Sequence, residues 1–274
     1  MRCAYVDAAH GQVHLREEGS GPPVLLLHKT PTSSLTYTRV LPLLAAAGYR
    51  AIAIDTPGYG QSERPAEIPS QMAFYADTVR DVLDALGIEQ ARVVGFYTGA
   101  KIALETAARH PARVRALVLS GISVNDDAEQ KAAYAAFIRG LGHMQTSIQL
   151  DAEGRFLEGY PLSWFRDFLR GDGEQYLLEL IAYLQSARNY WWGYKASEAY
   201  GAADRLPLVQ CPALVLNPLD GLPYLVEKTR LAAERLPGAR YVEIRGTTEV
   251  CMEDPEGWTA PIADFLRDVD AATG

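Results

Sequence analysis

The sequence predicts an α/β protein in which a mostly parallel sheet is flanked by helices. Short, continuously apolar runs such as 24–27 and 51–54 are typical of strands that are buried on both faces. Longer segments with apolar residues at helical spacing follow these runs in regular alternation. Strands that alternate with helices imply parallel pairing through right-handed crossovers, and ligands then bind at the carboxyl ends of the strands.

The individual elements follow from the same patterns in chain order. Gly48 closes the first expected helix, and His110-Pro111 ends the third. We expect strands at 12–17, 24–27, 51–54, 91–94, 114–120, 211–216 and 241–244, and helices at 33–47, 72–86, 100–108, 225–236 and 255–269.

The alternation breaks between residues 124 and 203. This segment lacks a clear buried strand, has helical patterning and is rich in aromatic residues, with a dense patch that includes Trp191 and Trp192. The two tryptophans either pack inside the segment or contact a flat, largely apolar ligand. We therefore expect a core formed by 1–123 and 204–274 and a helical insertion at 124–203.

Composition and charge exclude several classes of partner and cofactor. The 274 residues carry a net charge of −8, which argues against a nucleic acid or an anionic membrane surface as partner. Three scattered cysteines fit a reducing cytoplasm, and neither a signal peptide nor a transmembrane stretch is evident. The five histidines are dispersed and no dinucleotide fingerprint is present, so we expect neither a metal nor a cofactor. The sequence indicates no oligomeric state.

A strand–turn–helix unit at 91–108 carries the most informative motif. Gly95 and Gly99 flank Tyr97 with the spacing Gly-x-nucleophile-x-Gly. Small residues are needed there because the turn is strained and the strand and helix pack closely. The unit resembles the nucleophile elbow of the α/β-hydrolase superfamily, with tyrosine in the position of the usual Ser, Cys or Asp.

Two further motifs extend this resemblance over essentially the whole chain. Residues 55–62 look like the superfamily's D-x-P-G-x-G-x-S loop. The run 28–31 resembles the H-G-x-P motif of epoxide hydrolases and dehalogenases, with Lys29 in place of glycine, and His28 would pack under the loop. The resemblance implies an α/β-hydrolase fold and identifies 124–203 as its inserted helical cap.

The resemblance also implies an acid after the strand at 211–216 and a histidine after the last strand. Asp220 fits the acid position, although a turn or helix-start aspartate is the plainer interpretation. The histidine position falls on Glu249 or Thr248, and we favour Glu249 because a carboxylate can accept a proton. A solvated loop glutamate is the alternative. The chain thus looks like an atypical member that lacks both the standard nucleophile and the catalytic histidine.

An oxyanion hole can survive this loss because its donors are backbone groups. The N–H groups of Thr30 and Thr98 are the expected donors, with Phe96 beside them at the substrate. Lys29 either points inward, where its charge would lower the pKa of Tyr97, or outward as a surface lysine.

Tyr97 has three interpretations: a general acid/base or hydrogen-bond donor, a plug that fills the nucleophile's space, and a ring on which a ligand stacks. Cys251, Ser33 and Ser34 are alternative nucleophiles, but none has the strand–turn–helix setting that aims one.

These observations favour an enzyme that acts on a small apolar molecule, aromatic or polyketide-like as in secondary metabolism, by acid/base chemistry without a Ser-His-Asp triad. Cyclisation, isomerisation, elimination or epoxide opening would fit. The alternatives are a hydrolase that uses carboxylate-activated water and a non-catalytic ligand-binding protein. Tyr97, Glu249, Asp220 and Lys29 are the candidate catalytic residues.

Overall fold

The structure is a computed structural model that describes residues 1–125, 132–133, 135–136, 152–153 and 173–272. Its centre is an eight-stranded sheet with the order β1-β2-β4-β3-β5-β6-β7-β8. The strands are β1 (Arg2–Ala8), β2 (Gly11–Glu18), β3 (Pro23–Leu27), β4 (Arg50–Ile54), β5 (Ala91–Phe96), β6 (Val114–Ser120), β7 (Ala213–Pro218) and β8 (Arg240–Ile244). From β4 to β8 every neighbouring pair is parallel, whereas β2 is antiparallel to both β1 and β4. The predicted mostly parallel sheet is confirmed.

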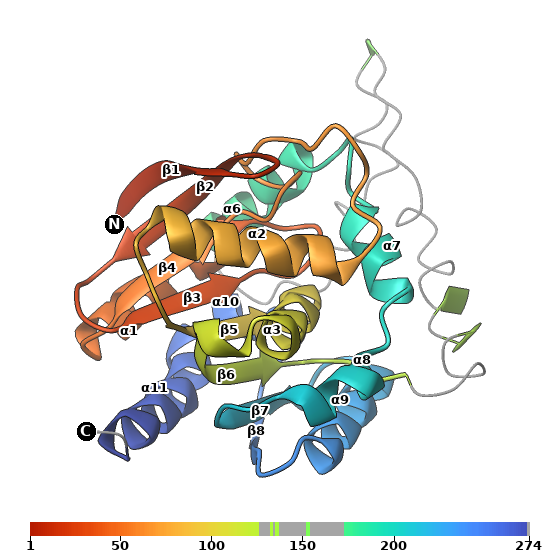
Figure 1. Cartoon of the computed structure of the whole chain (residues 1–274). Helices are drawn as coiled ribbons and strands as arrows, with labels where there is room; N and C mark the ends of the chain where they lie inside the picture. Colours follow the sequence, from red (N-terminus) through yellow and green to blue (C-terminus); the bar gives the residue numbers. More distant parts are fainter. Residues whose placement is uncertain (126–131, 134, 137–151, 154–172, 273–274) are drawn as a thin grey trace.

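Helices cover both faces of this sheet, as Figure 1 shows. The helices are α1 (Val40–Ala46), α2 (Met72–Ala85), α3 (Thr98–Arg109), α6 (Gly173–Gln185), α7 (Trp192–Glu198), α8 (Ala202–Arg205), α9 (Pro223–Arg235), α10 (Val250–Glu253) and α11 (Pro255–Ala271), with 3-10 turns η1 (Ser34–Tyr37), η2 (Pro111–Arg113) and η4 (Leu206–Leu208). None of the described helices is long and apolar enough to cross a membrane.

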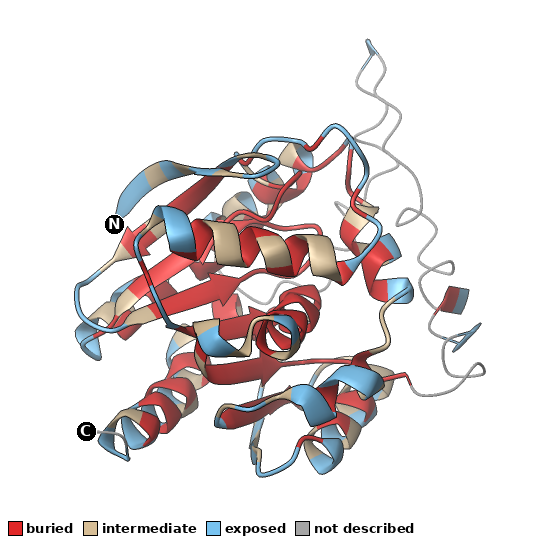
Figure 2. Ribbon diagram, in the orientation of Figure 1, coloured by how far each residue is buried: buried red, intermediate tan, exposed pale blue. Residues whose placement is uncertain are grey.

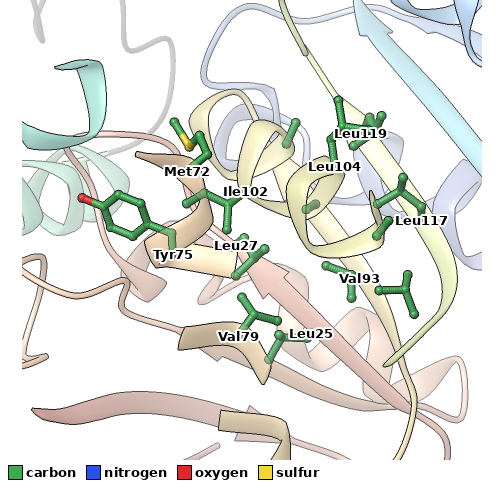
Figure 3. Close-up of a cluster of buried hydrophobic side chains, with 14 of the residues drawn as sticks. Leu25, Leu27, Met72, Tyr75, Val79, Val93, Ile102, Leu104, Leu117 and Leu119 are labelled. Carbon is green, nitrogen blue, oxygen red and sulfur yellow. The ribbon is translucent and has the colours of Figure 1, made fainter. Parts of the chain in front are cut away.

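Alternate residues of the central strands face opposite cores. Leu25 and Leu27 of β3 pack with residues of α2 and α3 in one core (Figure 3). Val24 and Leu26 of the same strand join α1 and α11 in the other. Because both faces of the sheet are covered, every residue of β3, β4, β5 and β7 except the first of β3 and of β4 is buried (Figure 2).

Two expected elements differ from the structure. The helix expected at 33–47 is divided into η1 and α1, because Pro42 suits only the first turn of a helix, where its missing N–H is not needed. The strand β1 was not expected; it pairs antiparallel with β2 at the sheet edge, and its alternating exposure leaves it no continuous apolar run.

Much of the expected insertion at 124–203 lies outside the described residues. Its described part from 173 onward is helical and contains α6 and α7 between β6 and β7. The short helix α8 crosses the boundary expected at 203. The division into core and cap therefore stays a prediction.

Candidate active site

The turn between β5 and α3 places Tyr97 at the carboxyl end of the sheet. Tyr97 has φ 49° and ψ −104°, a backbone conformation that side chains other than glycine rarely adopt. A Cβ at Gly95 would lie 2.5 Å from Cα of Ala100, and one at Gly99 would lie 1.9 Å from the carbonyl oxygen of Leu27. Close backbone packing therefore requires both glycines of the Gly-x-Tyr-x-Gly motif.

The ring of Tyr97 is packed on several sides. It stands edge-on to Phe96, with ring centroids 4.7 Å apart. A Cβ at Gly121 would lie 2.7 Å from Cζ of the tyrosine, and a Cβ at Gly221 would lie 3.5 Å from its hydroxyl oxygen. The phenol thus fills the space between the loops that follow β6 and β7.

The pKa of Tyr97 moves in the direction opposite to the one expected. Burial raises the pKa of the phenol above its usual value, and the nearby charge of Glu249 raises it further. The expectation that Lys29 lowers the pKa of Tyr97 is therefore wrong, because the carboxylates of Glu249 and Glu179 offset the positive charge of Lys29. Tyr97 stays a neutral hydroxyl that can donate a hydrogen bond.

Lys29 points inward from the loop after β3 and is 7% exposed. Its Nζ forms an ion pair with Oε1 of Glu249 and lies 3.2 Å from Oε1 of Glu179. Burial disfavours the ammonium, but the charges of the two glutamates outweigh burial and raise the pKa of Lys29. The lysine is therefore a fixed cation rather than a proton donor.

Glu249 is the N-cap residue immediately before α10, and it is buried. Burial raises the pKa of its carboxyl group to about 8; the charge of Lys29 opposes this shift, and the carboxylate of Glu179 adds to it. The neighbouring Thr248 places its hydroxyl 3.4 Å from Oε1 of Glu249. Of the two candidates for the histidine position, Glu249 is the one that contacts Lys29.

Glu179 is the residue that the sequence reasoning missed. It lies on α6, is fully buried and contacts Lys29. One turn earlier, Gln175 donates a hydrogen bond to the carbonyl of Met252. The available signal was helical spacing: positions 175, 179 and 183 share a buried face, and two polar residues on such a face indicate a polar partner.

Asp220 is not brought to Glu249. Its carboxylate accepts a hydrogen bond from the N–H of Gly246 at 2.9 Å and pairs with Arg245 at 2.6 Å. These contacts join the ends of β7 and β8. The role of Asp220 as an orienting acid stays a prediction, because its contacts with Gly246 and Arg245 do not involve Glu249.

The expected oxyanion donors occupy the loops that the motifs indicate. Thr98 is the first residue of α3, so its N–H has no acceptor within the helix. Thr30 accepts a hydrogen bond at its carbonyl from the hydroxyl of Tyr194 at 2.9 Å. Thr30 is thereby held against α7, and its role in an oxyanion hole stays a prediction.

The two tryptophans are half-buried at the start of α7. The ring of Trp192 packs against the backbone of Gly58, where a Cβ would lie 2.9 Å from it. The Nζ of Lys195 lies 5.2 Å from the ring centroid of Trp191. Within the described residues, no His, Cys, Asp or Glu group is arranged to hold a metal.

Comparisons with known proteins agree with this architecture. A model of the α/β hydrolase fold matches residues 22–177. A 2-hydroxymuconate semialdehyde hydrolase of Pseudomonas putida is 36% identical over 163 residues, which are 58% of this chain and 58% of that protein. Bifunctional epoxide hydrolase 2 of Rattus norvegicus is 37% identical over 124 residues, which are 42% of this chain and 22% of that protein. The matched part of the chain thus spans at most 58% of the length of these curated relatives. Both relatives are enzymes.

Solved structures show the same fold over nearly the whole chain. The enol-lactonase of Burkholderia xenovorans LB400 has a TM-score of 0.74 at 22% identity and covers 96% of this chain and 100% of its own. A Vigna radiata epoxide hydrolase mutant has a TM-score of 0.80 at 19% identity and covers 97% and 98%. With the sheet order, the Tyr97 turn and the matched family model taken together, this chain belongs to the α/β hydrolase fold family.

Proposed function

We propose that this protein is an enzyme that moves protons on a small, largely apolar substrate without a Ser-His-Asp triad. The observation that carries the proposal is the buried ion pair of Lys29 and Glu249, next to a tyrosine that occupies the elbow. Buried charges are costly, and ionisable groups with strongly shifted pKa values cluster at functional sites.

Each group has a distinct task in the proposed site. Glu249, with a pKa of about 8, gives or takes a proton near neutral pH. Tyr97 donates a hydrogen bond to a substrate oxygen, and Lys29 stabilises the carboxylate that remains after proton transfer. The N–H groups of Thr30 and Thr98 would hold a carbonyl or a developing oxyanion.

The reaction classes that fit are epoxide opening, elimination, isomerisation and cyclisation. Epoxide opening gains support from the relatives and neighbours that are named epoxide hydrolases. The aromatic start of α7, with Trp191 and Trp192, favours a flat apolar substrate. We also propose that the protein lies in the cytoplasm, works without a cofactor and uses the segment 124–203 as its cap.

A carboxylate-activated water is the second candidate mechanism. Oε2 of Glu249 accepts no hydrogen bond from the described residues, so it is available to a water molecule. Such a site would hydrolyse its substrate without a covalent intermediate. Single turnover in ¹⁸O-labelled water separates this hydrolysis from elimination, isomerisation and cyclisation, because the label enters the product only if water adds to the substrate.

The first test is a hydrolysis panel of p-nitrophenyl acetate and styrene oxide with the wild type, Tyr97→Phe and Glu249→Gln. We expect both variants to lose about 100-fold or more in kcat on any substrate that the wild type converts, the size typical of a lost acid/base group. Glu105→Gln is the matched control, because Glu105 is equally buried but forms its ion pair with Arg205 of α8. Equal turnover by wild type and both variants would contradict the proposal. Binding of an apolar ligand without turnover would favour a ligand-binding protein.

A further inference from the structure

Two carboxylates face one ammonium group in the candidate site. Oε1 of Glu249 and Oε1 of Glu179 both contact Nζ of Lys29, and the two glutamates lie within hydrogen-bond reach of one another. All three side chains are buried, and they come from the loop after β3, from α6 and from the start of α10.

The charges of this cluster do not balance unless one proton is added. Two ionised carboxylates and one ammonium would leave a net negative charge without water, which is costly in a protein interior. Oε2 of each glutamate accepts no hydrogen bond from the described residues, so an oxygen on either side is available for a shared proton. Like charges that share a site keep one carboxyl group protonated.

We propose that Glu179 and Glu249 share one proton beside Lys29 at neutral pH, and that Glu179 is the positioning residue that keeps Glu249 in its acid form. Glu179 acts through Glu249 and does not itself touch the substrate. The helix α6 is held in place for this task by the hydrogen bond from Gln175 to Met252.

The thiol and the two phenols around the cluster are neutral and do not compete for this proton. Burial raises the pKa values of the Cys251 thiol on α10 and of the Tyr37 phenol on η1 well above their usual range. Burial and the charge of Glu249 raise the pKa of Tyr97 at the elbow. The remaining charged neighbour is Glu253, which accepts a hydrogen bond from the hydroxyl of Thr247 at 2.8 Å.

The shared proton narrows the substrate class, provided that the proposed function holds. With one proton the cluster has no net charge and offers no attraction to an anion, so the substrate group beside it is a neutral oxygen such as that of an epoxide. In epoxide opening the O–H bond of Glu249 breaks and its proton goes to the epoxide oxygen. The electron pair of the breaking C–O bond stays on that oxygen, a water molecule adds to the carbon, and the proton that this water loses returns to the carboxylate pair.

The test is a ¹³C NMR titration of protein labelled at the side-chain carboxyl carbon of glutamate. We expect one glutamate in the wild type to titrate near pH 8. This titration should move to lower pH in Glu179→Gln, because the second carboxylate no longer opposes ionisation of Glu249, and it should be absent from Glu249→Gln. Glu105→Gln should keep the signal. Absence of such a signal from the wild type, or its persistence near pH 8 in Glu179→Gln, overturns the proposal.

Two additions make the result decisive. If Glu179→Gln does not fold, Glu179→Asp provides the readout: the shorter side chain should move the titration of Glu249 to lower pH, and an unchanged titration overturns the proposal. The titration needs no substrate, so it is independent of turnover. A titrating pair in a protein that converts no epoxide would leave the shared proton standing and contradict the proposed function alone.

Discussion

His28 and Lys29 are adjacent in the chain, yet they belong to two buried polar clusters of opposite character. His28 donates from Nδ1 to the carbonyl of Lys29 at 2.8 Å and accepts at Nε2 from the N–H of Thr56 at 3.0 Å. Burial lowers the pKa of His28, so the ring is neutral and both nitrogens are satisfied. The predicted structural role of His28 agrees with these contacts.

Asp55 completes the first cluster. Its Oδ1 accepts from the N–H of Ser34 at 2.6 Å, and its Oδ2 accepts from the N–H of Gln61 at 2.9 Å and contacts Nδ1 of His14 at 2.8 Å. Burial acts to raise the pKa of Asp55, but these hydrogen bonds prevail and lower it. A buried charge with every oxygen bonded stabilises the fold.

In the second cluster, formed by Lys29, Glu179 and Glu249, some carboxylate oxygens accept no hydrogen bond from the described residues. Oε2 of each glutamate accepts no hydrogen bond from the described residues, and the pKa of Glu249 rises to about 8 instead of falling. Buried polar groups that the fold leaves unsatisfied mark candidate sites of function. The two clusters are equally buried, and they differ in whether every carboxylate oxygen accepts a hydrogen bond.

The largest expected effect comes from Lys29→Met, which leaves two buried carboxylates without a cation. We expect a loss of about 3–5 kcal/mol in the free energy of unfolding at alkaline pH and a smaller loss near pH 5, where the raised pKa of Glu249 keeps its carboxyl group protonated. Urea unfolding at both pH values measures this. The control is Lys195→Met, since Lys195 is exposed on α7. A loss that does not depend on pH would contradict the assignment of the two glutamates as the partners of Lys29.

Asp55→Asn should destabilise the protein through the cluster of His28 and Asp55, with a somewhat smaller loss in the free energy of unfolding than Lys29→Met. The amide replaces one acceptor oxygen by a donor, which then faces an N–H group, and we expect a loss of about 2–3 kcal/mol. Asp264→Asn is the matched control, because Asp264 is 62% exposed and pairs with Arg267 at the surface of α11. Urea unfolding between about pH 6 and pH 9 should give the same loss throughout, since charged Asp55 does not titrate there. A strongly pH-dependent loss would erase the contrast between the two clusters.

Glu249→Gln should change the pH dependence of stability. A folded-state pKa of about 8 against an ordinary value of 4.5 means that the folded protein binds more protons between these pH values. Stability from this group is therefore present below pH 4.5 and is lost as pH rises through 8, with a slope of up to about 1.4 kcal/mol per pH unit. The variant should lack this decline, whereas a variant at an exposed glutamate, Glu256→Gln, should retain it. Parallel stability curves for wild type and Glu249→Gln would be the contrary result.

The smallest expected effect is that of Cys251→Ala. Cys251 is fully buried beside Glu249, and its pKa is raised by burial, so the thiol is a neutral packing group. We expect a loss of about 1 kcal/mol from the removed sulfur, measured by urea unfolding. The glutamate titration near pH 8 should stay unchanged. Loss of that titration would show that the thiol, rather than Glu179, shapes the cluster.

The sequence predicts the fold and the loops of the candidate site well, because both depend on local patterns. Continuous apolar runs identify the buried strands, and the glycines at 95 and 99 identify the turn at Tyr97. The edge strand β1 escapes this reasoning because its residues are half-exposed and its pairing with β2 is a property of the assembled sheet.

By itself the sequence determined the parallel sheet, the place of Tyr97 and the choice of Lys29 and Glu249 as candidates. Only the tertiary structure decided that Lys29 points inward, that Asp220 bonds to Gly246 and Arg245, and that Glu179 joins the site from α6. The physical reason is distance along the chain. Lys29 and Glu249 are 220 residues apart, and the sign of a pKa shift depends on which charges and how little water surround a group after the chain has folded.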